Sequence, residues 1–404
     1  MEADLTARFV ARAATAPTPG TVPAAVVTGL DETQQNVVAA LAGDGRLLVI
    51  EGAAGAGKTT TLAAARTVIE DVGQRLVVVT PTKKAAQIAA KQLGTAAFSA
   101  GWLAHQHGWR WDEHGTWTLH VGQVDRDERG RQRPYLGPRP EAQLGRGDVL
   151  LVDEAGMLDQ DTAHALLHVA DEYDARVVLV GDRRQLPAVG RGGILDLAAR
   201  FAAPEATLEL TTVHRFTDPD YAQVSLAMRT GEHPGDVFDT LAEKDLVRVY
   251  GSEIERADAL ADDTAHAIQH GEQVRVLADT NDQVAELNAA IRVHLVEAGR
   301  VDDERTVSTL SGHQIGAGDV VMTRQIDTDL GVANRETWTV TSVTRDGELT
   351  VTSKQGERTL PVETPAPRSS SPTPPPFTAV RARPLRPRTS PSASTPPPRP
   401  PTSR

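Results

Sequence analysis

Residues 47–60 read LLVIEGAAGAGKTT, an apolar run that leads into a glycine-rich turn and ends in Lys-Thr-Thr. The pattern Gly-x-x-x-x-Gly-Lys-Thr is typical of a phosphate-binding loop between a β-strand and an α-helix. Glycines let backbone N–H groups crowd around a triphosphate, and the helix N-terminus favours the anion. We expect Lys58 to reach the β- and γ-phosphates of ATP and Thr59 to ligate Mg²⁺. The expected nucleotide-binding residues are Gly52, Gly55, Ala56, Gly57, Lys58, Thr59 and Thr60.

Three further apolar runs, at residues 76–80, 149–152 and 177–180, alternate with alanine-rich helical stretches. This alternation is typical of a parallel sheet that is covered by helices. The sequence therefore predicts an α/β fold with flanking helices, which we assign to residues 28–240.

Carboxylates follow the third of these strands, where the chain reads VLLVDE at residues 149–154. In a nucleotide-hydrolysing site, Asp153 would support Mg²⁺ and Glu154 would activate or orient the attacking water. Such a pair is otherwise a solvated turn, but the phosphate-binding loop upstream favours the catalytic interpretation. The same edge of the sheet should carry the end of the next strand, VVLVGDRRQLP, where Gln185 is placed to contact the γ-phosphate. Arg215 offers a guanidinium for developing phosphoryl charge, although a surface ion pair is the commoner role for such a residue.

Five strings, in this order along the chain, are GAAGAGKTT, VVTPTKKAAQ, LLVDEAGML, VLVGDRRQLPAVGRGG and TTVHRF. They resemble the ordered motifs of superfamily 1 DNA helicases, and most closely the RecD-like branch that includes the helicase region of TraI/TrwC-type (MobF) conjugative relaxases. The resemblance covers residues 29–360. It implies a P-loop RecA-like ATPase domain, a partial second RecA-like lobe with a small SH3-like β-barrel, and 5′-to-3′ ATP-dependent DNA unwinding.

The same resemblance implies roles for individual side chains. Gln34, in LDETQQ, would read the adenine edge, and Asp153 and Glu154 would be the metal partner and the water activator. Gln185 would sense the γ-phosphate, and Arg215 would be the first of two arginine fingers. The path of single-stranded DNA would run along Thr80, Pro81, Thr82 and Lys83, which could equally form a plain strand-to-helix turn. Implied partners are single-stranded DNA and other conjugation or DNA-repair proteins.

The chain outside this domain is divided by composition. Residues 1–27 are expected to form a weak helix followed by a flexible lead, and residues 101–147 a polar insertion on the rim of the sheet. Residues 241–360 would form the partial second motor domain, with a strand at Val274–Ala278, a helix at 284–298 and a small antiparallel barrel at 319–351. The final segment, residues 361–404, holds 15 of the 26 prolines and is expected to be disordered.

Two strings expected after the barrel, Thr-x-His-x-x-Gln-Gly and Thr-Arg-x-Arg, do not occur in the sequence. The switch to low complexity at residue 361 favours a frame change in a GC-rich gene over a genuine disordered tail. We therefore expect a C-terminally truncated helicase without the nicking half of a relaxase. The alternatives are a nucleotide-binding, non-translocating subunit and a non-functional gene fragment.

The composition indicates the cellular compartment and the kind of DNA contact that we expect. The chain has no cysteine, no apolar stretch of the roughly 20 residues needed to cross a bilayer and no signal-peptide pattern, so we expect a cytoplasmic protein without membrane insertion. The net charge is −12, and the first 360 residues hold 35 basic against 53 acidic side chains. An acidic body disfavours non-specific DNA coating but allows a few local contacts with one strand.

Histidine and tryptophan gather in the rim insertion. Three roles were open: a metal cluster, a platform for stacking DNA bases and packing on the motor core. The absence of cysteine and the spacing speak against metal, and packing is the commonest role for such residues. The residues concerned are Trp102, His105, His107, Trp109, Trp111, His114, Trp117 and His120.

Overall fold

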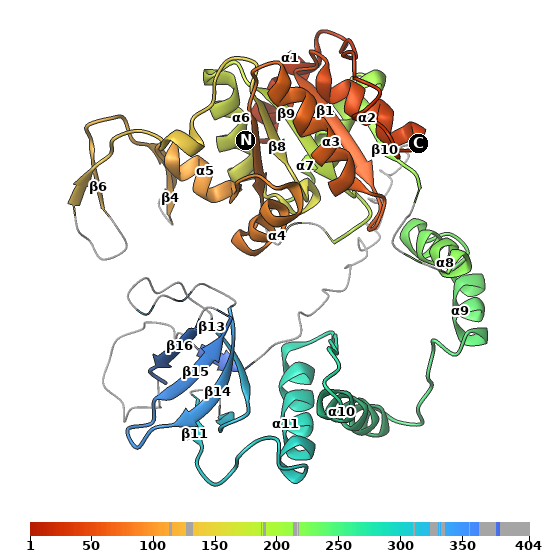
Figure 1. Cartoon of the computed structure of the whole chain (residues 1–404), viewed down its shortest axis with the longest axis vertical. Helices are drawn as coiled ribbons and strands as arrows, with labels where there is room; N and C mark the ends of the chain where they lie inside the picture. Colours follow the sequence, from red (N-terminus) through yellow and green to blue (C-terminus); the bar gives the residue numbers. More distant parts are fainter. Residues whose placement is uncertain are drawn as a thin grey trace, which may run out of the picture. The chain divides into compact units, whose positions relative to one another are not determined.

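The protein divides into two compact units, Met1–Val247 and Arg248–Arg404, in a computed structural model of the whole chain (Figure 1). The structure describes residues 1–112, 115–126, 132–186, 188, 191–212, 216, 218–309, 312–323, 330, 332, 336–354, 356–362 and 377–379. Within this part, none of the helices combines the length and the apolar character needed to span a bilayer.

Unit 1 is built on a six-stranded sheet in which every pair of neighbours is parallel. In spatial order its strands are β10 (Thr207–Leu210), β1 (Leu47–Gly52), β9 (Arg176–Gly181), β8 (Val149–Val152), β2 (Leu76–Thr80) and β3 (Ala97–Ser99). The four strands expected from apolar runs are present as β1, β2, β8 and β9. The predicted α/β architecture is therefore confirmed.

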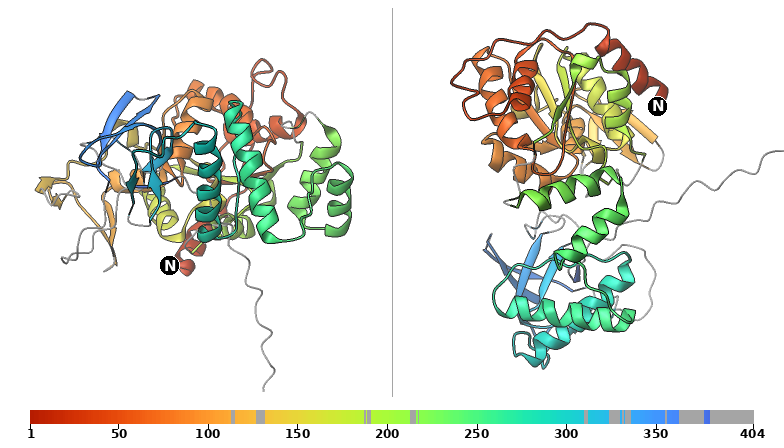
Figure 2. Two further views of the ribbon diagram at one scale, coloured as in Figure 1. Left: turned by 90° about the horizontal axis from the view of Figure 1, so that it is seen from below. Right: turned by 90° about the vertical axis from the view of Figure 1, so that its right-hand side faces the viewer.

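Helices cover both faces of this sheet (Figure 2). Alternate residues of each central strand point to opposite faces, so Leu47 and Val49 join one core whereas Leu48 and Ile50 join the other. The first core is closed by α1 (Glu2–Ala13), α5 (Ala100–Gln106), α6 (Gln160–Glu172) and α7 (Ile194–Phe201). The second is closed by α2 (Glu32–Ala42), α3 (Lys58–Asp71) and α4 (Lys83–Leu93).

Helix α1 confirms the helix expected at the start of residues 1–27, but it is a buried part of unit 1 rather than a weak helix in a flexible lead. Leu5 and Phe9 lie one helical turn apart on the same side of α1, and both are 0% exposed. Arg12 is also buried and donates a hydrogen bond of 2.9 Å to the carbonyl oxygen of Ala175. The Ala/Thr/Pro-rich composition obscured this short apolar stripe.

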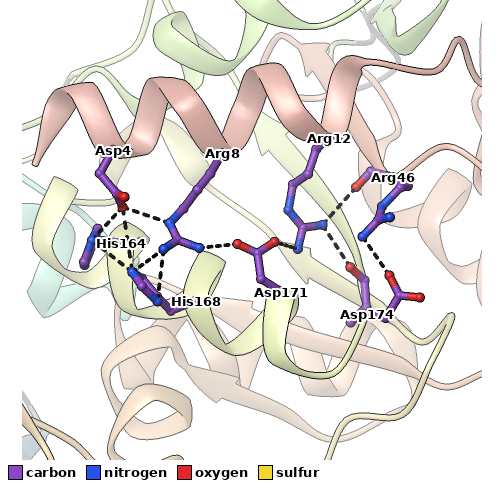
Figure 3. A network of polar contacts seen from close by, with 9 residues as sticks. Asp4, Arg8, Arg12, Arg46, His164, His168, Asp171 and Asp174 are labelled. Carbon is purple, nitrogen blue, oxygen red and sulfur yellow. Dashed lines mark hydrogen bonds and ion pairs between the residues drawn. The ribbon is translucent and has the colours of Figure 1, made fainter.

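A polar network fixes α1 to α6 (Figure 3). Arg8 pairs with Asp4, at 2.8 Å, and with Asp171. Asp4, His164 and His168 place a possible ligand atom each within 4.8 Å of one another. The Arg8 guanidinium, however, lies 2.6 Å from Nε2 of His168 and already provides a cation for this group. We therefore assign the network to the docking of α1.

The rim insertion consists largely of two antiparallel hairpins. They are formed by β4 (Trp109–Asp112) with β5 (Gly115–Thr118) and by β6 (Val124–Arg126) with β7 (Gln132–Pro134). Trp102 and Trp109 pack against the first core, whereas Trp111 and Trp117 are 42% and 45% exposed. Packing is thus confirmed for two of the four tryptophans.

No metal group forms from the histidines of the insertion that the structure describes. Nε2 of His107 instead lies 2.9 Å from the carbonyl oxygen of Ala142, and burial lowers the pKa of His107. His114 lies outside the described residues.

The remaining helices of unit 1 are α8 (Pro219–Thr230) and α9 (Pro234–Glu243), and unit 2 begins with α10 (Glu253–Gln269) and α11 (Asn281–Glu297). Helix α11 confirms the helix predicted at 284–298.

The strand predicted at Val274–Ala278 is wrong, because this segment has no regular structure. Val274 and Leu277 are 45% and 61% exposed, and no neighbouring strand is described that could pair with them. An apolar run without a partner strand cannot form a sheet.

The other regular elements described in unit 2 are β-strands. A five-stranded antiparallel sheet and the hairpin of β11 (Val307–Ser308) and β12 (Gln314–Ile315) share one core around Trp338, which is 1% exposed. The period-two stretch thus forms antiparallel strands as predicted, whereas closure into an SH3-like barrel stays a prediction. In spatial order the sheet is β16 (Gly356–Leu360), β15 (Leu349–Ser353), β14 (Thr337–Val343), β13 (Val320–Thr323) and β17 (Phe377–Ala379).

Strand β17 lies within the segment 361–404, for which we expected disorder. Its three residues pair with β13, where they satisfy backbone groups of that strand. Apart from residues 361–362 and β17, the segment lies outside the described residues.

Candidate active site

The glycine-rich loop runs from β1 into the first turn of α3. Gly55 and Gly57 have φ angles of +88° and +74°, a left-handed conformation that other residues adopt at a cost. A Cβ atom at Gly52 would lie 3.2 Å from Cβ of Leu210 and 3.3 Å from Cβ of Ala56, which is tight packing. These glycines are therefore required by the local backbone, and they leave N–H groups at the helix N-terminus.

The Lys58 side chain folds back across this loop. Its Nζ atom donates hydrogen bonds of 2.8 Å to the carbonyl oxygen of Gly52 and 3.3 Å to that of Ala53. Thr59 Oγ1 lies 3.5 Å from Oε1 of Gln92, and Thr60 is exposed in the first helical turn. An ammonium held against neutral carbonyl oxygens can exchange them for phosphate oxygens at little cost.

Asp153 and Glu154 follow β8, two strands from β1. Burial and the Glu154 carboxylate raise the pKa of Asp153 to about 6, while the Lys58 ammonium acts in the opposite direction. Lys58 and Asp153 therefore act on each other across the end of the sheet. Glu154 adopts φ +57°, and its N–H donates to Oδ1 of Asp153 at 3.0 Å. A left-handed non-glycine residue costs on the order of 1 kcal/mol and often occurs at functional sites.

The donor set fits a Mg²⁺ ion. Thr59 and Asp153 offer a hydroxyl and a carboxylate oxygen, the hard ligands that this ion prefers. The carboxyl group of Asp153 is also disfavoured as an anion where it stands, so a bound cation would stabilise its charged form.

Gln185 lies in the turn after β9, between the ends of β1 and β8. Its backbone N–H donates to the carbonyl oxygen of Asp182 at 3.2 Å, and its Nε2 lies 3.4 Å from Oδ2 of Asp182. Arg183, in the same turn, forms a 2.5 Å ion pair with Glu51 at the end of β1. The turn is thus fixed to the strand that precedes the glycine-rich loop.

Arg229 is a residue at this edge that the sequence did not indicate. Its Nε atom lies 3.0 Å from both carboxylate oxygens of Asp182. The two residues are 47 positions apart, and no local pattern connects them.

Gln34 lies in the first turn of α2 and is 4% exposed. It forms a capping box with Asp31, in which Oε1 of Gln34 accepts from the Asp31 N–H at 3.0 Å and Oδ1 of Asp31 accepts from the Gln34 N–H at 2.9 Å. This geometry directs the Gln34 amide by a local contact. Its Nε2 is the donor that remains suited to a purine nitrogen.

The four residues expected on the DNA path follow β2. Thr80 is 0% exposed, and its hydroxyl donates to the carbonyl oxygen of Thr82 at 2.8 Å. Thr82 caps α4 by accepting from the Ala85 N–H at 3.2 Å. Pro81 is half-buried and Lys83 is exposed. The turn therefore has a structural role, and only its outer residues can meet another molecule directly.

Arg215 lies outside the described residues. For the others, sheet order explains the assembly: β1, β9 and β8 are consecutive and parallel, so the glycine-rich loop, Gln185 and the acidic pair all follow carboxyl ends of the sheet.

Residues 29–252 match the family model described as AAA domain, which is more than half of the chain. The chain belongs to the AAA domain family. Membership of this family implies nucleotide binding, and the matched residues contain the glycine-rich loop and comprise most of unit 1.

Curated relatives include the conjugal transfer protein TraA of Rhizobium radiobacter, which is 27% identical over 310 residues. That alignment covers 76% of this chain and 25% of the relative. The ATP-dependent RecD2 DNA helicase of Deinococcus radiodurans is 35% identical over 194 residues, covering 48% of this chain and 23% of the relative. These similarities confirm the resemblance to RecD-like helicases near the conjugative type. The chain spans about a quarter of the length of these relatives.

Among solved structures, Bacteroides Pif1 bound to ssDNA aligns with a TM-score of 0.45 at 20% sequence identity. The alignment covers 82% of this chain and 73% of that one.

Proposed function

We propose that this chain is the ATP-hydrolysing motor module of a DNA helicase or translocase that acts in conjugative DNA processing. The observation that carries the proposal is the junction of three consecutive parallel strands, whose ends present the glycine-rich loop, Gln185 and the Asp153–Glu154 pair together. The relatives named TraA and RecD2 support the assignment to DNA processing.

In this proposal, each side chain has one task. Lys58 and the loop N–H groups hold the β- and γ-phosphates, and Thr59 and Asp153 hold Mg²⁺, which supplies charge neutralisation when bound. Glu154 accepts a proton from the attacking water, and Gln185 orients that water against the γ-phosphate. Gln34 contacts adenine, and Arg215 stabilises developing charge. Single-stranded DNA passes over Pro81 and Lys83.

A nucleotide-binding module that does not translocate is the second candidate. It is favoured by the segment Val274–Ala278, which has no regular structure where the second RecA-like lobe should begin with a strand. Translocation requires two lobes that close on ATP and open after hydrolysis.

Steady-state ATP hydrolysis with and without single-stranded DNA separates the two candidates. The motor proposal predicts stimulation by DNA that is lost in Lys58→Ala, because this substitution removes the ammonium from the phosphates. Nucleotide binding without DNA-stimulated turnover would contradict the motor and support the non-translocating module. Polarity is then measured with substrates that carry a 5′ or a 3′ single-stranded tail, and we expect 5′-to-3′ movement.

A further inference from the structure

Arg229 reaches the edge of the sheet from the last turn of α8. Its side chain is 16% exposed, and its Nε atom lies 3.0 Å from each carboxylate oxygen of Asp182. One Nη atom of the same guanidinium lies 3.7 Å from Oε1 of Glu209. Arg229 therefore contacts two acidic residues at different strands of the sheet, one within β10 and one directly after β9.

These two contacts bridge the phosphate-binding strand. Asp182 directly follows β9, and Glu209 lies in β10 opposite Glu51 of β1. Because β1 is the strand between β10 and β9, the Arg229 guanidinium extends across the end of β1, where the glycine-rich loop starts. Helix α8 is thus fixed beside the strand end from which the glycine-rich loop starts.

Asp182 also controls the position of Gln185. Its Oδ1 accepts from the N–H of Arg184 at 3.0 Å, and its Oδ2 lies 3.4 Å from Nε2 of Gln185. Asp182 is 4% exposed; burial raises its pKa, but the hydrogen bonds from Arg229 and Arg184 outweigh this effect and lower it. To reach a γ-phosphate, the Gln185 amide must leave the Asp182 carboxylate. Asp182 must then keep its hydrogen bonds from Arg229 and from the Arg184 N–H.

We propose that Arg229 is a positioning residue that links α8 to the nucleotide: it holds the Asp182 carboxylate while Gln185 turns toward the γ-phosphate. This inference rests on the proposed ATPase function. Without Arg229, the buried Asp182 carboxylate retains the Gln185 amide as its nearest side-chain donor. Gln185 then stays turned away from the γ-phosphate. Phosphate binding by Lys58 and the loop does not depend on this contact, so hydrolysis is lost and binding is kept.

The first test compares Arg229→Gln with a matched control, Lys244→Gln, at the residue that directly follows α9. Lys244→Gln removes ion pairs of 3.5 Å to Asp218 and Asp220, near the start of α8, and leaves Asp182 untouched. In DNA-stimulated ATP hydrolysis, we expect Arg229→Gln to lower kcat by about tenfold or more with KM for ATP within about twofold. Lys244→Gln should leave both constants unchanged. Arg229→Lys, which keeps the charge but not the planar fork, should recover part of kcat.

A double-mutant cycle shows whether Arg229 acts through Asp182. If it does, Arg229→Gln should cost little once Asp182→Asn is present, because the two side chains act as a unit. Additive losses in kcat would overturn the inference, and so would equal losses in Arg229→Gln and Lys244→Gln, which would indicate that α8 only needs to be anchored.

The second test does not require turnover. Hydrogen exchange of the α8 peptides is measured with and without Mg²⁺, ADP and aluminium fluoride. We expect a nucleotide-dependent change in α8 that disappears in Arg229→Gln and persists in Lys244→Gln. A wild-type protein without ATP hydrolysis would contradict the proposed function, whereas an α8 response that is the same in wild type and Arg229→Gln would contradict this inference alone. If Arg229→Gln does not fold, the same comparison is made with Arg229→Lys.

Discussion

Lys58 and Asp153 share one electrostatic environment at the scale of single residues. The Lys58 ammonium opposes the rise in pKa that burial and Glu154 impose on Asp153. Lys58 is at the same time held by two carbonyl oxygens of its own loop, so its charge faces the site without a carboxylate partner among the contacts described for it. The Lys58 ammonium can pair with a triphosphate, and the desolvated Asp153 carboxylate can pair with Mg²⁺.

The pH dependence of Mg²⁺-dependent nucleotide binding follows from Asp153. Its folded-state pKa of about 6 lies above the unfolded value, so charging this carboxyl destabilises the ligand-free fold as the pH rises from about 4 to about 6. Mg²⁺ competes with that proton, so its contribution should be small at about pH 5 and fully present near pH 7.5. We expect the increase in Tm caused by Mg²⁺ with ADP to grow over this range.

Asp153→Asn is the control, because ADP itself also titrates. In this variant, the Mg²⁺-dependent part of the Tm increase should be small and nearly independent of pH. A full, pH-dependent Mg²⁺ effect in Asp153→Asn would exclude this carboxylate as a metal ligand.

At the scale of elements, α1 is held to unit 1 by a few specific contacts. Leu5 and Phe9 are fully buried, and Arg12 and Arg8 both pair with Asp171 of α6. Such a helix contributes to the stability of the sheet that carries the site.

Phe9→Ala tests the burial of α1 directly. Loss of a fully buried phenylalanine should reduce the free energy of unfolding of unit 1 by about 3–5 kcal/mol. Val10→Ala is the matched control, since Val10 is 48% exposed on the same helix and its substitution should change stability by less than about 0.5 kcal/mol. Urea denaturation measures both; equal stability of the two variants would mean that α1 is not docked.

The elements that were predictable are those with strong local patterns. The strands β1, β2, β8 and β9 are continuous apolar runs, because parallel strands buried on both faces have no polar side. Strand β3, of three residues, was too short to be seen, and the run at Val274–Ala278 has the composition of a strand but no described neighbour. Pairing is a tertiary property that composition does not contain.

The residues of the site also divide into those that local sequence patterns predicted and those that they did not. The loop, Gln185 and the acidic pair could be placed together because parallel strands end at one edge of the sheet. The contact between Arg229 and Asp182 could not, because it depends on where α8 returns to the sheet. The burial of Thr80 was also beyond the local pattern, since a threonine at a strand end is as often exposed.

At the scale of the whole molecule, the two units have separate cores. The core of unit 2 is centred on Trp338, whose Nε1 has no hydrogen-bond partner among the described residues. The described residues of this core differ from those of the two cores that enclose the sheet of unit 1. A substitution inside one core should therefore act first on the stability of the unit that contains it.

Trp338→Ala should lower the Tm of unit 2 and leave that of unit 1 unchanged, because it opens a cavity in one core only. Mg²⁺ with ADP should raise the transition of unit 1, which carries the glycine-rich loop. Trp338→Phe is the control: it keeps most of the ring volume and removes the unpaired N–H, so its cost should stay below that of the alanine. Differential scanning calorimetry measures the two variants and the effect of Mg²⁺ with ADP. A single transition that shifts as a whole would contradict separate unfolding transitions for the two units.

The most direct test of the hydrolytic site is a comparison of wild type with Glu154→Gln, in which ATP binding and DNA-stimulated ATP hydrolysis are measured on the same preparations. If the strand ends form one site with Glu154 as the base, the variant should bind Mg²⁺ and ATP within a few-fold of wild type and hydrolyse ATP about 10² to 10⁴ times more slowly. Hydrolysis at the wild-type rate by Glu154→Gln would contradict the account.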